Sequence, residues 1–429
     1  MKSATQWCGI AMLATVALAL AACHNDNQAS SAQWASTVLP AHDAPGFATI
    51  QRGLYLVRAG DCASCHTANN GAPFAGGHPV LTPFGIIYST NITPDEDTGI
   101  GKWSETDLYR AMHTGLDRQK NHLYPAMPYV WYTKVTPDDV RAIKAYLDTL
   151  KPVRQVNRKP ELPWPMSDRS VMGAWNKMYF NEGTFAPDAR KSAAWNRGAY
   201  LVEGLGHCGA CHTDPNFAGA PTGKPLHGGL LVGSFAPSLA GGLRDGLGGW
   251  TAPEIVEYLK SGSNDKTAAA GAMAEVIANS TQHLSDSDLA DIATYLKDMP
   301  APTSKSDKTD LAQNTRSLGA AVYVDNCAAC HMDNGQGQPQ VFPQLKGSSA
   351  VQAAKAETMI RVVLAGAGIP ATTSKPTGLK MPAFNEKLDD DQIAAVVSYI
   401  RNAWGNHASF VSAGDVAKMR TNLRKKGSE

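Results

Sequence analysis

Three segments of the chain carry apolar side chains at the spacing of one helix face. In each, apolar positions recur at i, i+3, i+4 and i+7, which is typical of a helix with one buried side. Acidic or hydroxyl residues, the usual helix starts, precede each segment: Thr136 to Asp139, Ser285 to Asp288, and Asp389 to Asp391. No strand-like alternation of any length competes, so the pattern predicts an all-α fold. The apolar positions are Val140, Ile143, Tyr146, Leu147 and Leu150; Leu289, Ile292, Tyr295 and Leu296; and Ile393, Val396, Val397 and Ile400.

A second pattern recurs upstream of each of these segments. Residues 52–57 read RGLYLV and residues 197–202 read RGAYLV, while residues 318–323 read LGAAVY more loosely. Glycine followed by apolar and aromatic residues predicts a short helix that packs closely against a neighbour at the glycine. Residues 99–103 (GIGKW) and 246–250 (GLGGW) also match. The chain therefore contains three copies of one unit.

The repeats divide the 429 residues into three predicted domains of about a hundred residues each. A segment rich in Pro, Trp and Met is predicted to be an irregular surface linker, and a polar segment to be a second linker. The short basic tail is predicted to be frayed and solvated, with a helix on an anionic membrane or on a partner as the alternative. The predicted domains are 44–155, 191–300 and 314–406, the linkers are 156–190 and 301–313, and the tail is 407–429.

The N-terminal residues 1–22 have the pattern of an export signal. Lys2 gives a positive start, and residues 9–22 form an apolar run too short to span a bilayer comfortably. The run ends at Cys23 in a sequence that resembles a lipoprotein cleavage box, so we expect a lipid on Cys23 to anchor the chain at the periplasmic side of the cell membrane. An ordinary cleavage site at Ala19-Leu20-Ala21 is the alternative. No later segment is long and apolar enough to span a membrane.

Composition and charge exclude one class of function. The chain is 43% hydrophobic and 18% charged, and its formal net charge is +1. Such a balance gives no strong field for a polyanion, so we expect no nucleic-acid partner.

Cysteine usage points to a specific cofactor. Of eight cysteines, Cys8 falls in the signal, Cys23 at the cleavage site, and six in three Cys-x-x-Cys pairs, each followed at once by His. Two thiols three residues apart lie on one side of a helical turn and can both reach the vinyl groups of a porphyrin, and the His can bind the iron. A thioredoxin-like redox pair of cysteines would lie in a βαβ unit, which the helical pattern does not provide. A zinc site would need closely spaced Cys or His pairs that converge, and it would not explain the His after each pair. The motifs therefore predict three covalent haem c groups, on Cys62, Cys65 and His66; Cys208, Cys211 and His212; and Cys327, Cys330 and His331.

The second axial iron ligand is expected to be a methionine shortly before the closing helix of each repeat. Met127 and Met273 each lie 61 residues after the histidine of their own motif, and Met381 lies 50 residues after His331. Although methionine is more often a core filler, this repeated placement favours ligation. With His and Met on the iron, no site remains open for oxygen or peroxide, which suits electron relay. Other histidines fit surface or structural roles. A place for His207 at the edge of the second haem is the less favoured alternative.

With these residues placed, residues 49–405 resemble the triheme cytochrome c subunits of bacterial membrane-bound alcohol, gluconate, sorbitol and fructose dehydrogenases. The resemblance rests on residues 82–94 (TPFGIIYSTNITP), 123–129 (LYPAMPY), 273–277 (MAEVI) and 280–284 (STQHL). It implies three tandem class I cytochrome c domains. It also implies a catalytic partner subunit, with flavin or pyrroloquinoline quinone, and delivery of electrons to ubiquinone or the respiratory chain. The basic tail departs from the C-terminal membrane segment common in that family.

The resemblance thus implies a redox subunit with no catalytic residues of its own. Two alternatives stay open at this point. One is a multihaem peroxidase-type enzyme, for which Met273, whose flank lacks the proline that follows the other two methionines, would be the displaceable ligand. The other is a free-standing carrier that serves a terminal oxidase.

Overall fold

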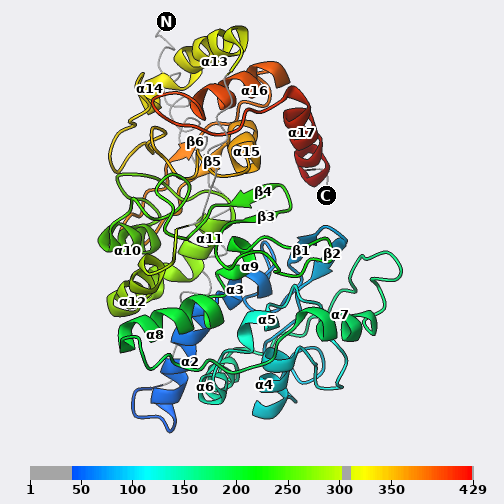
Figure 1. Cartoon of the computed structure of the whole chain (residues 1–429). Helices are drawn as coiled ribbons and strands as arrows, with labels where there is room; N and C mark the ends of the chain where they lie inside the picture. The colour runs from blue at the N-terminus through cyan, green and yellow to red at the C-terminus, as the bar shows by residue number, and fades with distance from the viewer. Residues whose placement is uncertain (1–40, 302–310, 428–429) are drawn as a thin grey trace, which may run out of the picture.

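The computed structural model describes residues 41–301 and 311–427, so the predicted signal peptide, Cys23 and most of the second linker lie outside the described residues. Helices and three small hairpins follow one another in three repeats, joined by a long connection between the first two (Figure 1). The first repeat comprises α2 (Phe47–Ala59), α3 (Cys62–His66), β1 (Pro79–Thr82), β2 (Gly85–Tyr88), α4 (Glu105–Thr114), α5 (Tyr129–Tyr132) and α6 (Pro137–Leu147). The connection contains α7 (Val171–Tyr179).

The second repeat follows the element order of the first, whereas in the third the hairpin comes after the middle helix and not before it. The second comprises α8 (Ala193–Tyr200), the π-helical turn η1 (Leu201–Leu205), α9 (Gly209–His212), β3 (Gly229–Leu231), β4 (Ser234–Ala236), α10 (Ala252–Ser261), α11 (Ala272–Asn279), the 3₁₀ turn η2 (Thr281–His283) and α12 (Asp286–Lys297). The third comprises α13 (Gln313–Asn326), α14 (Ala328–His331), α15 (Glu357–Ala365), β5 (Ala367–Gly368), β6 (Lys380–Met381) and α16 (Asp390–Ile400), and it is followed by α17 (Ala413–Gly427).

In each repeat the first helix crosses the closing helix at the glycine of the recurring sequence. A Cβ on Gly53 would lie 2.0 Å from the carbonyl oxygen of Ala142 in α6. A Cβ on Gly198 would lie 2.0 Å from the carbonyl oxygen of Asp291, and one on Gly319 would lie 2.4 Å from that of Ala395. These distances are shorter than any van der Waals contact. The predicted close packing at the glycines is therefore confirmed in all three repeats.

Replacing Gly53 by alanine is expected to lower the free energy of unfolding by about 3 kcal/mol, because the added methyl group forces α2 and α6 apart. Chemical denaturation of the haem-loaded protein measures the change. The matched control is Gly183→Ala, since no atom lies within 4 Å of a Cβ at Gly183. Equal stability of the two variants would show that the helix crossing does not depend on the glycine.

Three antiparallel two-stranded hairpins accompany the helices. In the first, Pro79 pairs with Tyr88 and Thr82 with Gly85; in the second, Gly229 pairs with Ala236. Strands of two to four residues are too short to show an alternating pattern in the sequence. The fold is therefore helix-rich, as predicted, and not strictly all-α.

The long connection is more ordered than the irregular linker that its composition predicts. Helix α7 buries Met172 and Trp175 in a small apolar cluster with Tyr129 of the first repeat and Ala220 of the second. The Trp175 indole Nε1 donates a hydrogen bond of 2.9 Å to the carbonyl of Ala218. The connection thus packs against both repeats that it joins.

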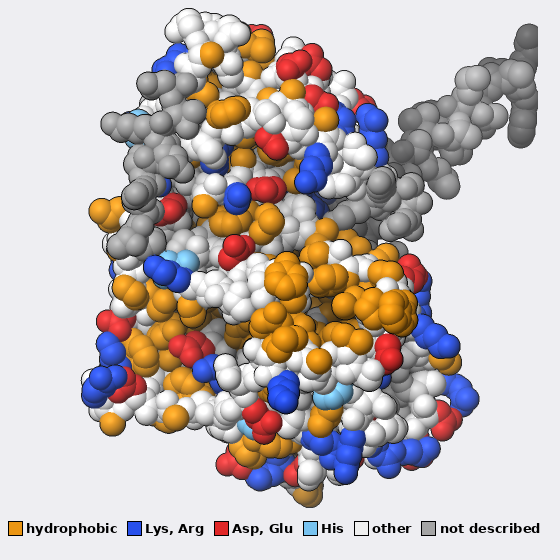
Figure 2. Space-filling view, turned by 45° about the vertical axis from the view of Figure 1, so that its right-hand side comes forward, with side chains coloured by type: hydrophobic (Ala, Val, Ile, Leu, Met, Phe, Trp, Pro, Cys, Tyr) orange, Lys and Arg blue, Asp and Glu red, His pale blue; other side chains and the backbone are white. Residues whose placement is uncertain are grey.

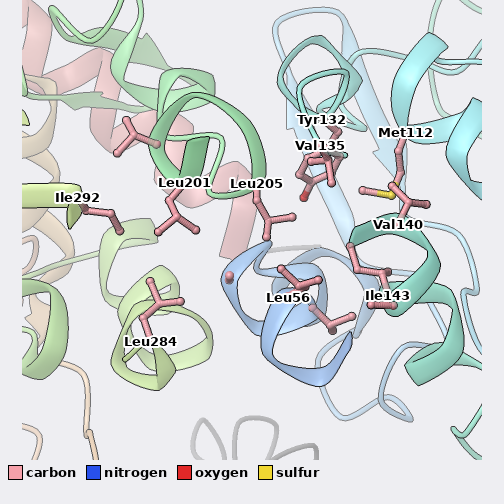
Figure 3. Close-up of a cluster of buried hydrophobic side chains, with 14 of the residues drawn as sticks. Leu56, Met112, Tyr132, Val135, Val140, Ile143, Leu201, Leu205, Leu284 and Ile292 are labelled. Carbon is pink, nitrogen blue, oxygen red and sulfur yellow. The ribbon is translucent and has the colours of Figure 1, made fainter. Parts of the chain in front are cut away.

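The first two repeats share one hydrophobic core, whereas the third has its own. Figure 3 shows the shared core, where Leu205 of η1 lies beside Leu56 of α2. Both leucines are 0–1% exposed. Repeats one and two are therefore packed as a single unit.

The basic tail was predicted to be solvated, and this prediction is wrong. Helix α17 packs its apolar face against α15 and α16, and Val416 and Met419 are 0% and 5% exposed. The Arg420 guanidinium binds Asp390 at 2.8 Å and the carbonyl of Leu388 at 3.0 Å. The apolar face of α17 is thus covered by the third repeat. Among residues 41–301 and 311–427 no helix combines the length and apolar character needed to cross a membrane.

Candidate haem-binding sites

Each of the three sequence motifs occupies one short helical turn. Helices α3, α9 and α14 carry the motif residues, with Cys208 and Cys327 at the starts of α9 and α14. All six thiols are free, and burial raises the pKa of Cys62 and of Cys208 to about 12. The described residues contain no group of three His, Cys, Asp or Glu side chains that could hold a metal ion by themselves. Two thiols and an imidazole on one helical turn fit attachment to a porphyrin.

The three motif histidines are held in the same way. Nδ1 of His66 lies 2.7 Å from the carbonyl oxygen of Thr90. Nδ1 of His212 lies 2.7 Å from the carbonyl oxygen of Pro237, and that of His331 lies 3.0 Å from the carbonyl oxygen of Pro343. A carbonyl only accepts, so Nδ1 must carry the proton and Nε2 keeps its lone pair for a metal.

Burial lowers the pKa of all three histidines, which favours the neutral ring that can bind iron. The carbonyl acceptors leave no trace in the sequence, because every residue has a carbonyl. Sequence reasoning therefore missed Thr90, Pro237 and Pro343.

A second contact, made by the backbone carbonyl, holds His66 and His212. The carbonyl of His66 accepts from Gly76 N–H at 2.8 Å, and that of His212 accepts from Gly228 N–H at 2.9 Å. In the first repeat the hairpin β1–β2 lies between Gly76 and Thr90, and in the second β3–β4 lies between Gly228 and Pro237. The bases of these two hairpins thus fix His66 and His212.

The three candidate methionine ligands lie before the closing helices, as the spacing predicts. Met127 lies in the turn before α5 and packs, half-buried, against the shared core. Met381 lies in β6 and packs against the core of the third repeat. Met273 differs, since it is the second residue of α11, where it is half-buried. Their role as iron ligands stays a prediction.

The sequences of the three repeats match a known protein family. The sequence model described as Cytochrome c matches residues 50–151, 196–300 and 317–404. The chain belongs to the cytochrome c family. Members of this family bind haem c covalently, which is the chemistry that the free thiols and the oriented imidazoles of this cytochrome provide.

Curated relatives cover nearly the whole cytochrome. It is 42% identical to the gluconate 2-dehydrogenase cytochrome c subunit of Pantoea cypripedii, over 89% of this chain and 91% of that protein. It is also 42% identical to the cytochrome c subunit of the quinone alcohol dehydrogenase of Gluconobacter oxydans, over 87% and 82%. The fructose dehydrogenase cytochrome subunit of Gluconobacter japonicus is 36% identical to it, over 87% and 82%. The resemblance expected from the sequence motifs is therefore confirmed.

The first two motif turns lie at the seam between their repeats. Asn279 Nδ2 in α11 donates to Ser64 Oγ in α3 at 2.8 Å, and the thiols of Cys65 and Cys211 are close enough to influence each other electrostatically. The ring of His207 stacks on that of Tyr132, with centroids 5.4 Å apart. His207 of the second repeat thus contacts the first repeat at this seam.

Two reciprocal hydrogen bonds lock the first two repeats together. Tyr55 OH donates to Asp288 Oδ2 across the seam, and Tyr200 OH donates to Asp139 Oδ2, each at 2.5 Å. Within its own repeat, Arg52 Nε binds Asp139 at 2.9 Å, and Arg197 Nε binds Asp288 at 2.8 Å. Because the two halves exchange equivalent groups, they meet with approximate two-fold symmetry.

Replacing Tyr55 or Tyr200 by phenylalanine is expected to lower the free energy of unfolding by about 2 kcal/mol each, since a buried carboxylate loses a hydrogen-bond donor. Chemical denaturation measures the loss. Tyr179→Phe is the control, because no hydrogen bond of its hydroxyl occurs in the described part of the chain. No difference between these variants would contradict a locking role for the exchanged tyrosines.

The stability that Asp288 contributes at the seam is expected to depend on pH. Burial raises the pKa of the Asp288 carboxyl, but hydrogen bonds from Arg197 and Tyr55 outweigh burial, so that the pKa is lowered. A lowered pKa in the folded state adds stability above the unfolded value of about 4, and this stability is lost as the pH falls through the folded value. The Tyr55→Phe variant should therefore lose less stability than the parent protein on acidification from pH 6 to pH 3.

Proposed function

We propose that this cytochrome carries three haem c groups and is the electron-transfer subunit of a dehydrogenase complex. One observation carries the proposal: the same constellation of two thiols and a carbonyl-oriented imidazole recurs on three helical turns. Attachment is through Cys62 and Cys65, Cys208 and Cys211, and Cys327 and Cys330. The proposed axial pairs are His66 with Met127, His212 with Met273, and His331 with Met381.

The chain's own groups bind, orient and shield the cofactor. Bound haem supplies a reversible one-electron change of its iron, and a thioether ligand favours the ferrous state. The backbone carbonyls hold each imidazole in the tautomer that ligates, and the apolar cores exclude water around the motif turns. The relatives are cytochrome subunits of dehydrogenases, which supports a redox subunit that is not an enzyme by itself.

The partner follows from the relatives' names and from their coverage of the chain. We infer a catalytic dehydrogenase subunit, a flavoprotein or a quinoprotein, as electron donor, and ubiquinone or the respiratory chain as acceptor. The locked pair of repeats one and two supports relay, since it fixes two motif turns at one seam. We further propose export, and attachment to the periplasmic side of the membrane by a lipid on Cys23.

The experiment is purification of the protein from solubilised membranes of a host that exports it. We expect a flavoprotein or quinoprotein to co-purify, and the substrate of that partner to reduce the haem. Reduced protein should not bind carbon monoxide at neutral pH if all three irons have two protein ligands. Carbon monoxide binding together with peroxide turnover would replace this proposal by the peroxidase alternative.

A further inference from the structure

The first and second haem motifs each differ at one position from the third. The third motif reads Cys-Ala-Ala-Cys-His at residues 327–331. The first motif has Ser64 in place of the second alanine, and the second motif has Gly209 in place of the first alanine. Because the third motif has alanine at both positions, the proposed attachment of haem requires neither the serine nor the glycine. Their contacts therefore point to another role.

Ser64 contacts the helix that carries the candidate methionine of the second repeat. Its hydroxyl accepts a hydrogen bond of 2.8 Å from Asn279 Nδ2, at the end of α11, and donates one of 2.6 Å to Asp61 Oδ1. The residue after α11, Ser280, donates across the same seam to the carbonyl of Ala59 at 3.3 Å. Ser280 and Ala59 are each 3% exposed. The C-terminal end of α11 is thus fastened to the first repeat.

The fastened end of α11 determines where Met273 lies. Met273 is the second residue of this eight-residue helix, about 9 Å along its axis from Asn279. The helix begins after Gly271, which has a φ of 57° and makes no side-chain cap. Since the start of α11 lacks a cap, the contacts of its other end with the first repeat fix the direction of the helix and of its methionine.

Gly209 contacts the segment that follows the candidate methionine of the first repeat. A Cβ on Gly209 would lie 2.6 Å from Nε1 of Trp131 in α5. The first residue of α5 donates its N–H to the carbonyl of Met127 at 2.7 Å. The ring of Tyr132, also in α5, stacks on His207, directly before the second motif. The second motif turn thus supports the ligand segment of the first repeat, and the support between the two repeats is reciprocal.

The candidate methionine of the third repeat is held within its own repeat. Met381 of β6 pairs with Ala367 of β5. The third repeat forms the upper part of the molecule in Figure 1 and, seen from another side, in Figure 2. Figure 1 shows α14 at the top, apart from α3 and α9 in the middle. The residues that distinguish the first two motifs from the third are therefore the ones that touch a ligand segment of the neighbouring repeat.

We propose that Ser64 and Gly209 are positioning residues, through which each of the first two motif turns holds the axial methionine of the other repeat. The inference rests on the proposed axial pairs. It makes the first two haems a coupled pair, in which a change at one motif turn alters the iron of the neighbouring repeat, and it leaves the third iron independent. Because a thioether ligand favours ferrous iron, a loosened methionine lowers the reduction potential of its own iron.

Two alanine substitutions test the proposal in the haem-loaded full-length protein. Ser64→Ala and Gly209→Ala each convert a motif into the Cys-Ala-Ala-Cys-His of the third repeat, so three haems should still be bound. A spectroelectrochemical titration measures the three potentials, and Met273→His and Met127→His identify those of the second and first irons. We expect Ser64→Ala to lower the potential of the second iron and Gly209→Ala to lower that of the first.

Carbon monoxide gives a second readout, since it binds an iron whose methionine has detached. In reduced Ser64→Ala the population of detached methionine should rise about tenfold, which is the effect of losing one hydrogen bond. Asn279→Ala should act equally, and the double variant should add nothing further. Ser64→Thr keeps the hydroxyl and should behave as the parent protein. The matched control is Ala329→Ser, at an exposed position of the third motif, which should change no potential.

Three results would overturn the proposal. If Ser64→Ala changes the potential of the first iron and not of the second, the serine acts within its own repeat. If neither alanine variant changes a potential, the contacts across the seam do not position the methionines. If either variant binds fewer than three haems, the residue serves the attachment of its own haem. Unchanged potentials in Met273→His and Met127→His are a separate outcome, which contradicts the proposed axial pairs themselves.

Discussion

Replacing Cys208 and Cys211 together by alanine is expected to remove one third of the bound haem and to destabilise the first two repeats together. Covalent attachment is lost at α9, and the second repeat then lacks the cofactor around which its apolar side chains pack. Because that core continues into the first repeat through Leu201 and Leu205, unfolding should spread across the seam. The ratio of haem to protein absorbance measures the first effect, and thermal unfolding by circular dichroism measures the second.

The matched control removes the haem attachment site of the third repeat. In Cys327→Ala with Cys330→Ala, one third of the haem should again be lost, but the third repeat has its own core. The unfolding transition of the first two repeats should therefore stay where it is in the parent protein. Retention of all haem in either double variant would contradict the assigned attachment sites. An equal loss of stability in both would contradict the separation of the two cores.

Replacing Met381 by histidine is expected to lower one of the three reduction potentials by on the order of 0.1 V, since axial ligands set haem potentials over a range of roughly 0.8 V. Histidine replaces a soft thioether, which favours ferrous iron, by a harder nitrogen ligand. Met381 is half-buried in β6, directly before the loop that leads to α16. A spectroelectrochemical titration of the haem-loaded protein resolves the change.

The same substitution elsewhere is the control. Met178 in α7 is 66% exposed and fits no ligand position, so Met178→His should leave all three potentials unchanged. If Met381→His also leaves them unchanged, the sixth ligand of the third iron is another group. The same comparison with Met273→His tests the assignment in the second repeat, where the methionine lies in a helix and not in a loop.

The sequence predicts the features that depend on local spacing. The closing helices are visible because one face is apolar, and residues such as Val140, Leu289 and Ile393 are at most 1% exposed. The close helix crossings are visible because only glycine fits at Gly53 and its equivalents. The motif turns are visible because two thiols and an imidazole must share one helical turn.

Features that depend on distant partners are not visible in the sequence. Tyr55 and Asp288 are 233 residues apart, and neither has a local signal for the hydrogen bond between them. The apolar face of α17 is evident from its spacing, but no local pattern shows that α15 and α16 cover it, and the basic residues favour a solvated tail. The hairpins are too short for a periodic pattern, although the first two of them help to hold His66 and His212.

The mass of the mature protein, produced in a host that exports it and attaches haem, tests the central claim most directly. The account predicts the mass of the mature polypeptide with its lipid plus three haem groups, with no titratable thiol at any of the six motif cysteines. A mass without these additions, or free thiols at those positions in the denatured protein, would contradict it.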